Sequence, residues 1–124
     1  MNHTPDLLNH PALRPYKDSI CATARPCAEI TLLPAANLTL WQSKLGGQPY
    51  WPKDMEYPRN AKGRPLHLLA QINFAEMPPL PDFPEEGILQ FFISRNDGIE
   101  KMWGMNADNP ADQQGFRVVY QADI

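Results

Sequence analysis

Two groups of polar residues have the types and spacing to bind a ligand. The first is Lys44, which precedes Gly46 and Gly47. Backbone N–H groups in a glycine turn beside an ammonium group suit a phosphate or a carboxylate. A phosphate loop, however, has the order G-x-x-x-x-G-K-[ST] and leads into a helix, whereas here Lys44 comes first and Pro49 and Pro52 exclude a following helix. The simpler interpretation is a tight turn.

The second group consists of three side-chain amides on two predicted strands. Gln71 and Asn73 lie on one face of the strand predicted from Leu66 to Phe74, opposite its apolar residues. Gln90 lies beside them if this strand pairs with the one predicted from Ile88 to Ser94. Three amides together suit a polar ligand, but buried amides usually bond to backbone groups, and an irregular loop supplies such groups. We prefer the second interpretation.

No catalytic, metal or cofactor site is expected from the sequence. The serines, cysteines and histidines lie in no G-x-S-x-G elbow or related motif. Cys21 and Cys27 have a spacing that does not fit a zinc knuckle. A disulfide between them is the alternative, but in a cytoplasmic chain we expect them to be reduced. If a polar pocket exists, the candidate ligand-binding residues are Lys44, Gln71, Asn73, Gln90, Arg117 and Tyr120.

The composition predicts that these residues belong to one folded domain. The length of 124 residues is a common size for a single core, and 43% hydrophobic with 10% aromatic residues argue against disorder. The net charge of −3 comes from interspersed residues without a Lys/Arg run, so no nucleic-acid partner is expected. We also expect no membrane association and a cytoplasmic location, because the sequence has neither a long apolar stretch nor a signal peptide.

The elements that position these residues must be short, because 14 prolines each remove a backbone donor. Apolar residues at three- or four-residue steps predict a helix from about Pro15 to Ala24. The segment from Ser43 to Arg64 is predicted to be an ordered loop rich in proline and glycine. The predicted strands are Glu29 to Leu33, Leu38 to Trp41, Leu66 to Phe74, Ile88 to Ser94, Ile99 to Met105 and Phe116 to Tyr120.

Three blocks of the sequence resemble a known family. They run from Ser43 to Pro52, from Pro65 to Phe74 and from Gly87 to Ile93, and they are similar to the YwqG-like family of bacterial proteins. Gly115 to Tyr120 is similar to the next block of that family. The resemblance implies an α+β fold and no particular reaction. Because family members are usually at least twice as long, it also implies that residues 1–124 form the N-terminal part of a longer family domain.

We therefore expect an α+β domain in which an N-terminal helix packs on a largely antiparallel sheet of five or six strands, crossed by the long loop. The expected function is a non-enzymatic protein-interaction module, because ordered loops with aromatic residues and a free sheet edge suit protein recognition. A free edge also predicts a homodimer. The alternative is a small-molecule-binding or enzymatic domain with a polar pocket.

Overall fold

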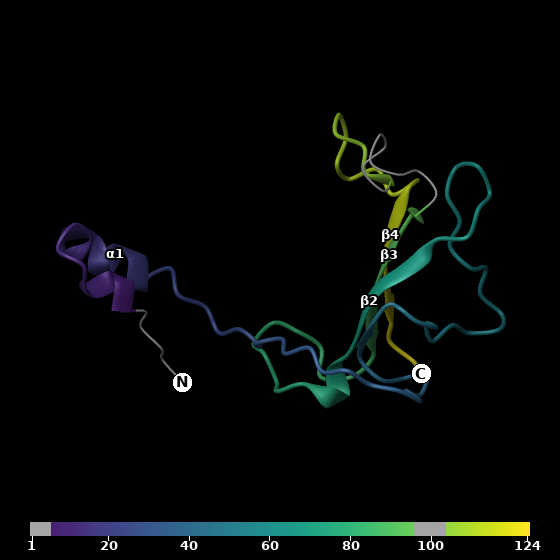
Figure 1. The fold of residues 1–124 in the computed structure, drawn as a ribbon, viewed down its shortest axis with the longest axis horizontal. Helices are drawn as coiled ribbons and strands as arrows, with labels where there is room; N and C mark the ends of the chain where they lie inside the picture. Colours follow the sequence, from purple (N-terminus) through teal and green to yellow (C-terminus); the bar gives the residue numbers. More distant parts are fainter. Residues whose placement is uncertain (1–5, 96–103) are drawn as a thin grey trace.

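The computed structural model describes residues 6–95 and 104–124 (Figure 1). Its helices and strands are, in chain order, η1 (Asp6–Asn9), η2 (Arg14–Tyr16), α1 (Lys17–Cys21), β1 (Lys44–Leu45), β2 (His67–Asn73), η3 (Phe74–Glu76), β3 (Ile88–Ile93) and β4 (Phe116–Gln121). The strands form one antiparallel sheet in the order β1-β2-β3-β4. The α+β class expected from the sequence is confirmed.

Three of the predicted strands are confirmed to within about one residue as β2, β3 and β4. Strand β3 is apolar on both faces apart from Gln90 and lies between β2 and β4, as its composition indicated. The sheet nevertheless has four strands within the described residues, fewer than the five or six expected. The strand predicted from Ile99 to Met105 falls mostly outside the described residues, and the strand that follows β3 in the sheet is β4.

A β-bulge in β2 decides which residues face the core. The register of β2 against β3 shifts between Leu68 and Ala70, and beyond the bulge Gln71 pairs with Gln90. As a result Leu68, Gln71 and Asn73 are all buried on the same face. The predicted alternation, with Gln71 and Asn73 opposite Leu68, is wrong because the additional residue in the bulge moves the following side chains to the other face.

The long loop covers one face of the sheet, which we call the covered face. In Figure 1 this loop lies on one side of the strands, to their right. Leu66, Leu68 and Phe92 form the buried cluster beneath it. The rings of Trp51 and Tyr57 pack edge-to-face on Phe92 at 5.7 and 5.8 Å between centroids, a favourable aromatic geometry. The loop predicted between Ser43 and Arg64 is therefore ordered by its aromatic residues.

The N-terminal arm, residues 6–42, extends away from the sheet and carries the helices at its far end (Figure 1). The predicted helix forms only as η2 and α1, which end at Cys21. The expected packing of this helix on the sheet is not found, and Tyr16 and Ile20 are 61% and 38% exposed. A helix of five residues between prolines is too short to present an apolar stripe of useful width.

The two strands predicted in the arm are also wrong. Residues 29–33 and 38–41 are extended or turned and pair with no strand of the described chain. β-Propensity expresses packing against neighbouring strands more than a preference of the isolated backbone. Because it has no such neighbour, the segment that contains Ile30 and Leu32 is extended but unpaired.

No helix within residues 6–95 and 104–124 has the length and apolar character that crossing a membrane requires.

Candidate functional site

The amide of Gln71 lies at the centre of a buried polar cluster on the covered face. Its side chain is 1% exposed, and its Oε1 accepts from the Tyr50 N–H at 3.0 Å and from Gln90 Nε2 at 2.9 Å. Its Nε2 donates to the carbonyls of Leu40 and Gln42 at 2.8 and 2.9 Å. Every donor and acceptor site of this amide is therefore satisfied by the chain itself.

The neighbouring amides bind the same loop. Gln90 Nε2 also donates to the Tyr50 carbonyl at 2.7 Å. Asn73 Nδ2 donates to the Trp41 carbonyl at 3.0 Å, and its Oδ1 accepts from the Ala75 N–H at the start of η3, also at 3.0 Å. These bonds tie the arm and the loop to β2 and β3, since they satisfy backbone groups that no strand pairing reaches.

The ammonium of Lys44 joins this cluster at its margin. Nζ donates to the carbonyls of Thr39 and Gln48 at 2.8 Å each. Burial lowers the pKa of Lys44, and the nearby carboxylate of Glu76 raises it in part. Two of the three donors of this ammonium thus bind the backbone of its own chain, which leaves one for an external anion.

Within the described residues, Arg117 and Tyr120 make no hydrogen bond to these amides. Arg117 pairs with Phe92 in the sheet, next to the apolar core. Tyr120 pairs with Leu89 on the opposite face, and its hydroxyl donates to the Glu86 carbonyl at 2.8 Å. Of the six residues that the sequence proposed, the structure therefore brings together Lys44, Gln71, Asn73 and Gln90. Tyr120 lies on the opposite face, whereas Arg117 lies on the face of Gln90 without bonding to it.

The face of the sheet opposite the loop is apolar, and we call it the open face. It carries Leu69 from β2, Leu89, Phe91 and Ile93 from β3, and Phe116, Val118 and Tyr120 from β4. Leu69 and Val118 are 49% and 42% exposed. Single exposed apolar residues are ordinary, but a contiguous group on three adjacent strands is typical of a binding surface.

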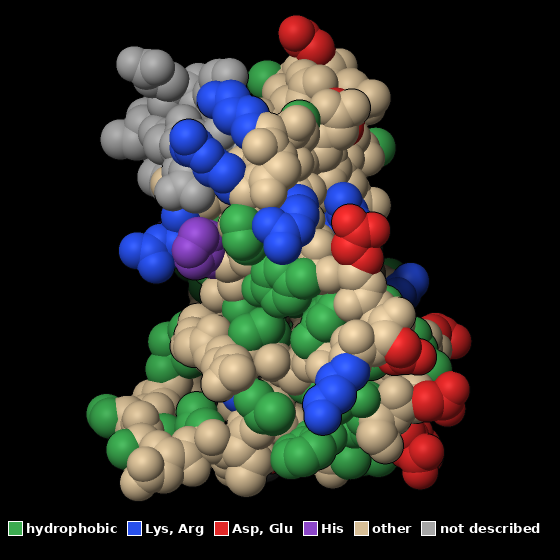
Figure 2. All heavy atoms as spheres, turned by 90° about the vertical axis from the view of Figure 1, so that its right-hand side faces the viewer, with side chains coloured by type: hydrophobic (Ala, Val, Ile, Leu, Met, Phe, Trp, Pro, Cys, Tyr) green, Lys and Arg blue, Asp and Glu red, His purple; other side chains and the backbone are tan. Residues whose placement is uncertain are grey.

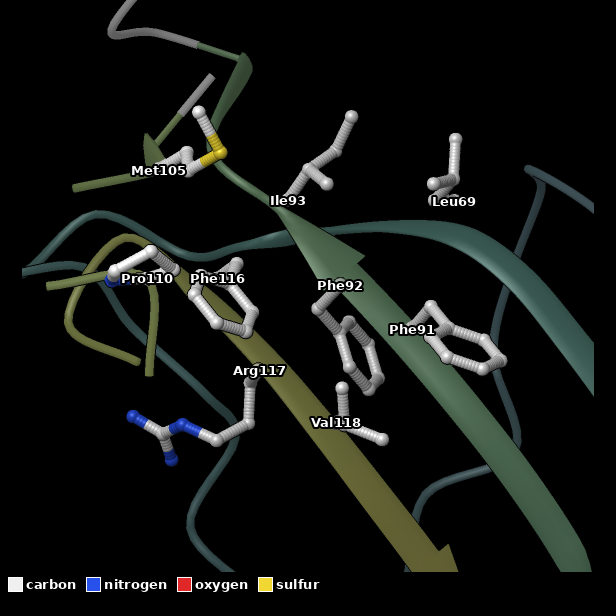
Figure 3. Close-up of a pocket in the computed structure, with 9 residues that line it drawn as sticks. All are labelled: Leu69, Phe91, Phe92, Ile93, Met105, Pro110, Phe116, Arg117 and Val118. Carbon is white, nitrogen blue, oxygen red and sulfur yellow. The ribbon is translucent and has the colours of Figure 1, made fainter. Parts of the chain in front are cut away.

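A hollow of about 430 Å³ lies at one end of the open face. Figure 3 shows it between the strands and the segment that carries Met105 and Pro110. Apolar side chains line it, among them Leu69, Phe91 and Phe116. Arg117 also contributes to the lining, although the alternation of β4 directs its side chain opposite to Phe116 and Val118. The hollow therefore suits an apolar group.

The surface on the loop side has a different character. Figure 2 shows Lys and Arg side chains gathered across the upper middle of this view and acidic side chains at its right-hand margin. Hydrophobic side chains lie mainly below them. A surface that mixes both signs of charge is typical of solvent contact, and this character applies to the upper part of the loop side, whereas its lower part carries apolar side chains (Figure 2).

Sequence reasoning missed two features of the site. Gln121 is 6% exposed and places its Nε2 3.5 Å from Gln90 Oε1; extending the last predicted strand by one residue would have found it. The hollow was missed because it combines residues from three strands with Met105 and Pro110. The one signal of the hollow in the sequence was the run of apolar residues on both faces of β3. Such a run forms a surface only once the strand is paired with its neighbours.

The sequence was also compared with known proteins. One family, described as a domain of unknown function (DUF1963), matches residues 43–124. The matched segment contains all four strands and the long loop, and it begins one residue before β1. No curated protein matches the sequence.

Proposed function

This chain belongs to the DUF1963 family of domains of unknown function, and we propose that it is a non-enzymatic protein-interaction module that binds through its open face. The observation that carries this proposal is the apolar surface of Leu69, Phe91 and Val118 on three adjacent strands. Burying apolar surface of this kind contributes about 25 cal/mol per Å². A protein partner is the class of ligand that covers a surface this broad.

The polar cluster supports the proposal because its hydrogen bonds go to the chain itself. Gln71, Gln90 and Asn73 direct their polar atoms to the backbone of the arm and the loop. These bonds hold the covered face together, and a rigid sheet is a suitable platform for recognition on its other face.

Within the family, we propose that the chain is a YwqG-like bacterial protein located in the cytoplasm. The support for the first point is the similarity of the blocks from Ser43 to Pro52 and from Pro65 to Phe74. The support for the location is the composition, with two cysteines that are both free and exposed in the structure.

The proposal is tested by affinity purification from the native cell followed by mass spectrometry, with three baits. The first is the wild type, the second carries Leu69→Glu and Val118→Glu on the open face, and the third carries Met55→Glu in the long loop. Met55 is 43% exposed, so the third bait controls for an added charge at an exposed apolar residue away from the open face. We expect a stoichiometric partner with the first and third baits and its loss with the second. Recovery of the same proteins with all three would overturn the proposal.

A second candidate function is the binding of an apolar small molecule, and the hollow beside Met105 and Phe116 favours it. Its volume of about 430 Å³ lies within the range of small-molecule sites. A metabolite extract passed over the immobilised chain distinguishes the two candidates. A bound apolar compound that Leu69→Glu releases supports this second function, whereas an extract that leaves nothing on the chain argues against it.

A further inference from the structure

Resting on the proposed function, we infer that the occupant of the open face is the N-terminal arm of a second copy of this chain. Each copy of the resulting dimer lays residues 28–34 of its arm over the hollow of the other. The proposal joins two apolar surfaces that the described chain leaves without cover, one on the arm and one on the sheet.

The arm carries apolar side chains that are largely exposed. Ile30, Leu32 and Leu33 are 74%, 65% and 78% exposed. They lie in an extended segment bounded by Pro26 and Pro34, and proline on either side prevents the segment from joining a helix. In an extended chain Ile30 and Leu32 point to the same side, which gives the segment one apolar edge.

The hollow is the matching surface. Its lining of Leu69, Phe91, Phe116 and Met105 accepts aliphatic side chains, and its volume of about 430 Å³ takes more than one of them. Between Pro26 and Leu38 the arm has a single charged residue, Glu29. Burying a charge would be unfavourable. The segment avoids this cost, because the side chains that enter the hollow, Ile30 and Leu32, are uncharged.

The position of the arm favours a second copy over the same chain. The carbonyls of Leu40, Trp41 and Gln42 are held by Gln71 and Asn73 on the covered face, near the end of β2. The hollow lies at the other end, where β3 ends and β4 begins, and a strand such as β2 spans about 20 Å. Its own arm reaches that point only by turning back along the sheet, whereas in Figure 1 it runs away from it.

The open face is also a better site for the arm of the second copy than the edge of β4. The backbone N–H of Val118 already donates to Gln113 Oε1 at 2.9 Å, so an added strand would have to displace this side chain. The side chain of Val118 itself remains 42% exposed. An exchange of arms uses the same two surfaces in both copies, as a twofold dimer requires.

Cross-linking between two distinguishable full-length chains tests the inference. The first chain carries Cys21→Ser and keeps Cys27, which is exposed three residues before Ile30. The second carries Cys21→Ser, Cys27→Ser and Val118→Cys, with a tag that changes its mass. A matched control replaces Val118→Cys in the second chain by Met55→Cys in the long loop, because Met55 and Val118 are 43% and 42% exposed. A short bis-maleimide reagent then links cysteines that lie close together, and gel electrophoresis counts the links.

We expect the mixed product to form several-fold faster with Val118→Cys than with Met55→Cys. Adding Ile30→Asp to the first chain should abolish this preference. Equal rates for the two positions would overturn the inference. So would a single chain carrying both Cys27 and Val118→Cys that links within itself at high dilution, because its own arm would then be the occupant.

Sedimentation equilibrium provides an independent readout that separates this inference from the proposed function. We expect the wild type to dimerise with rising concentration, and Leu32→Asp to weaken dimerisation by about tenfold or more, the loss expected for one buried leucine. Because Leu32 is 65% exposed in the single chain, the urea unfolding of the Leu32→Asp monomer should match that of the wild-type monomer. A wild type that stays monomeric, while Leu69→Glu and Val118→Glu still lose a captured protein, would overturn the arm exchange and leave the proposed function standing.

Discussion

At the scale of single residues, Gln71 is the side chain on which the loop depends most. It makes four hydrogen bonds to backbone and side-chain groups of the covered face. Gln71→Leu leaves those partners unpaired in a buried site, and we expect the free energy of unfolding to fall by about 2–3 kcal/mol. Urea unfolding measures it. Gln114→Leu, at an exposed position before β4, is the control and should change stability by less than about 0.5 kcal/mol.

Gly87 tests how closely β4 approaches the start of β3. It has a φ of +92°, and a Cβ at this position would lie 2.7 Å from the Gln121 carbonyl oxygen. Gly63 has a φ of +77° but nothing within 4 Å, so Gly63→Ala measures backbone strain alone. We expect Gly87→Ala to be less stable than Gly63→Ala by about 1–3 kcal/mol, the range for overpacking. Equal thermal stability of the two variants would contradict this contact.

Tyr57 makes the fold sensitive to alkaline pH. Burial raises the pKa of Tyr57 in the folded chain above its ordinary value of 10.0. At a pH between 10.0 and the folded pKa, the unfolded chain therefore binds fewer protons than the folded one. The contribution of Tyr57 is fully present below pH 10.0 and is lost as the pH rises through the folded pKa. We expect Tyr57→Phe, which removes the 2.9 Å bond to the Leu66 carbonyl, to lower stability at neutral pH by about 1 kcal/mol.

The same variant should lose less stability than the wild type as the pH rises above 10.0. Urea midpoints measured on either side of that pH give the comparison. Parallel pH profiles for the two chains would show that the Tyr57 phenol is not the group responsible.

At the scale of elements, the sequence predicts a strand best where the pattern of apolar residues alone indicates the place of that strand in the sheet. β3 has apolar residues on both faces and became the central strand. The bulge in β2 was not predictable, because the shift between Leu68 and Ala70 arises only when β2 is paired with β3. The segment around Ile30 has a strand composition but no neighbour, and propensity alone did not make it a strand.

Hydrogen exchange should rank the elements in the same order. In dilute solution we expect the slowest backbone amides in β3, which is paired on both sides. Residues 22–38 of the arm make few hydrogen bonds to the rest of the chain, and their amides should exchange fastest. If the arm is exchanged between copies, its protection should rise with protein concentration. An arm as protected as β3 at the lowest concentration would contradict the structure.

At the scale of the whole molecule, only part of the candidate site was accessible from the sequence. The pairing of Gln71 with Gln90 followed from two predicted strands, and the preference for backbone partners followed from the irregular loop. Arg117 and Tyr120 were both grouped with them, although residues three apart on a strand point to opposite faces, and only Arg117 lies on the face of Gln90. The open face depends on which face the loop covers, and that is a property of the folded chain.

The open face is the central claim, and the methyl groups on it report directly on its occupancy. A soluble paramagnetic agent should strongly relax the labelled methyl groups of Leu69, Ile93 and Val118 in the dilute chain. In an extract of the native cell we expect these methyl groups to become protected, while that of Met55, 43% exposed in the long loop, remains relaxed. Equal relaxation of the open-face methyl groups in both conditions would contradict the account.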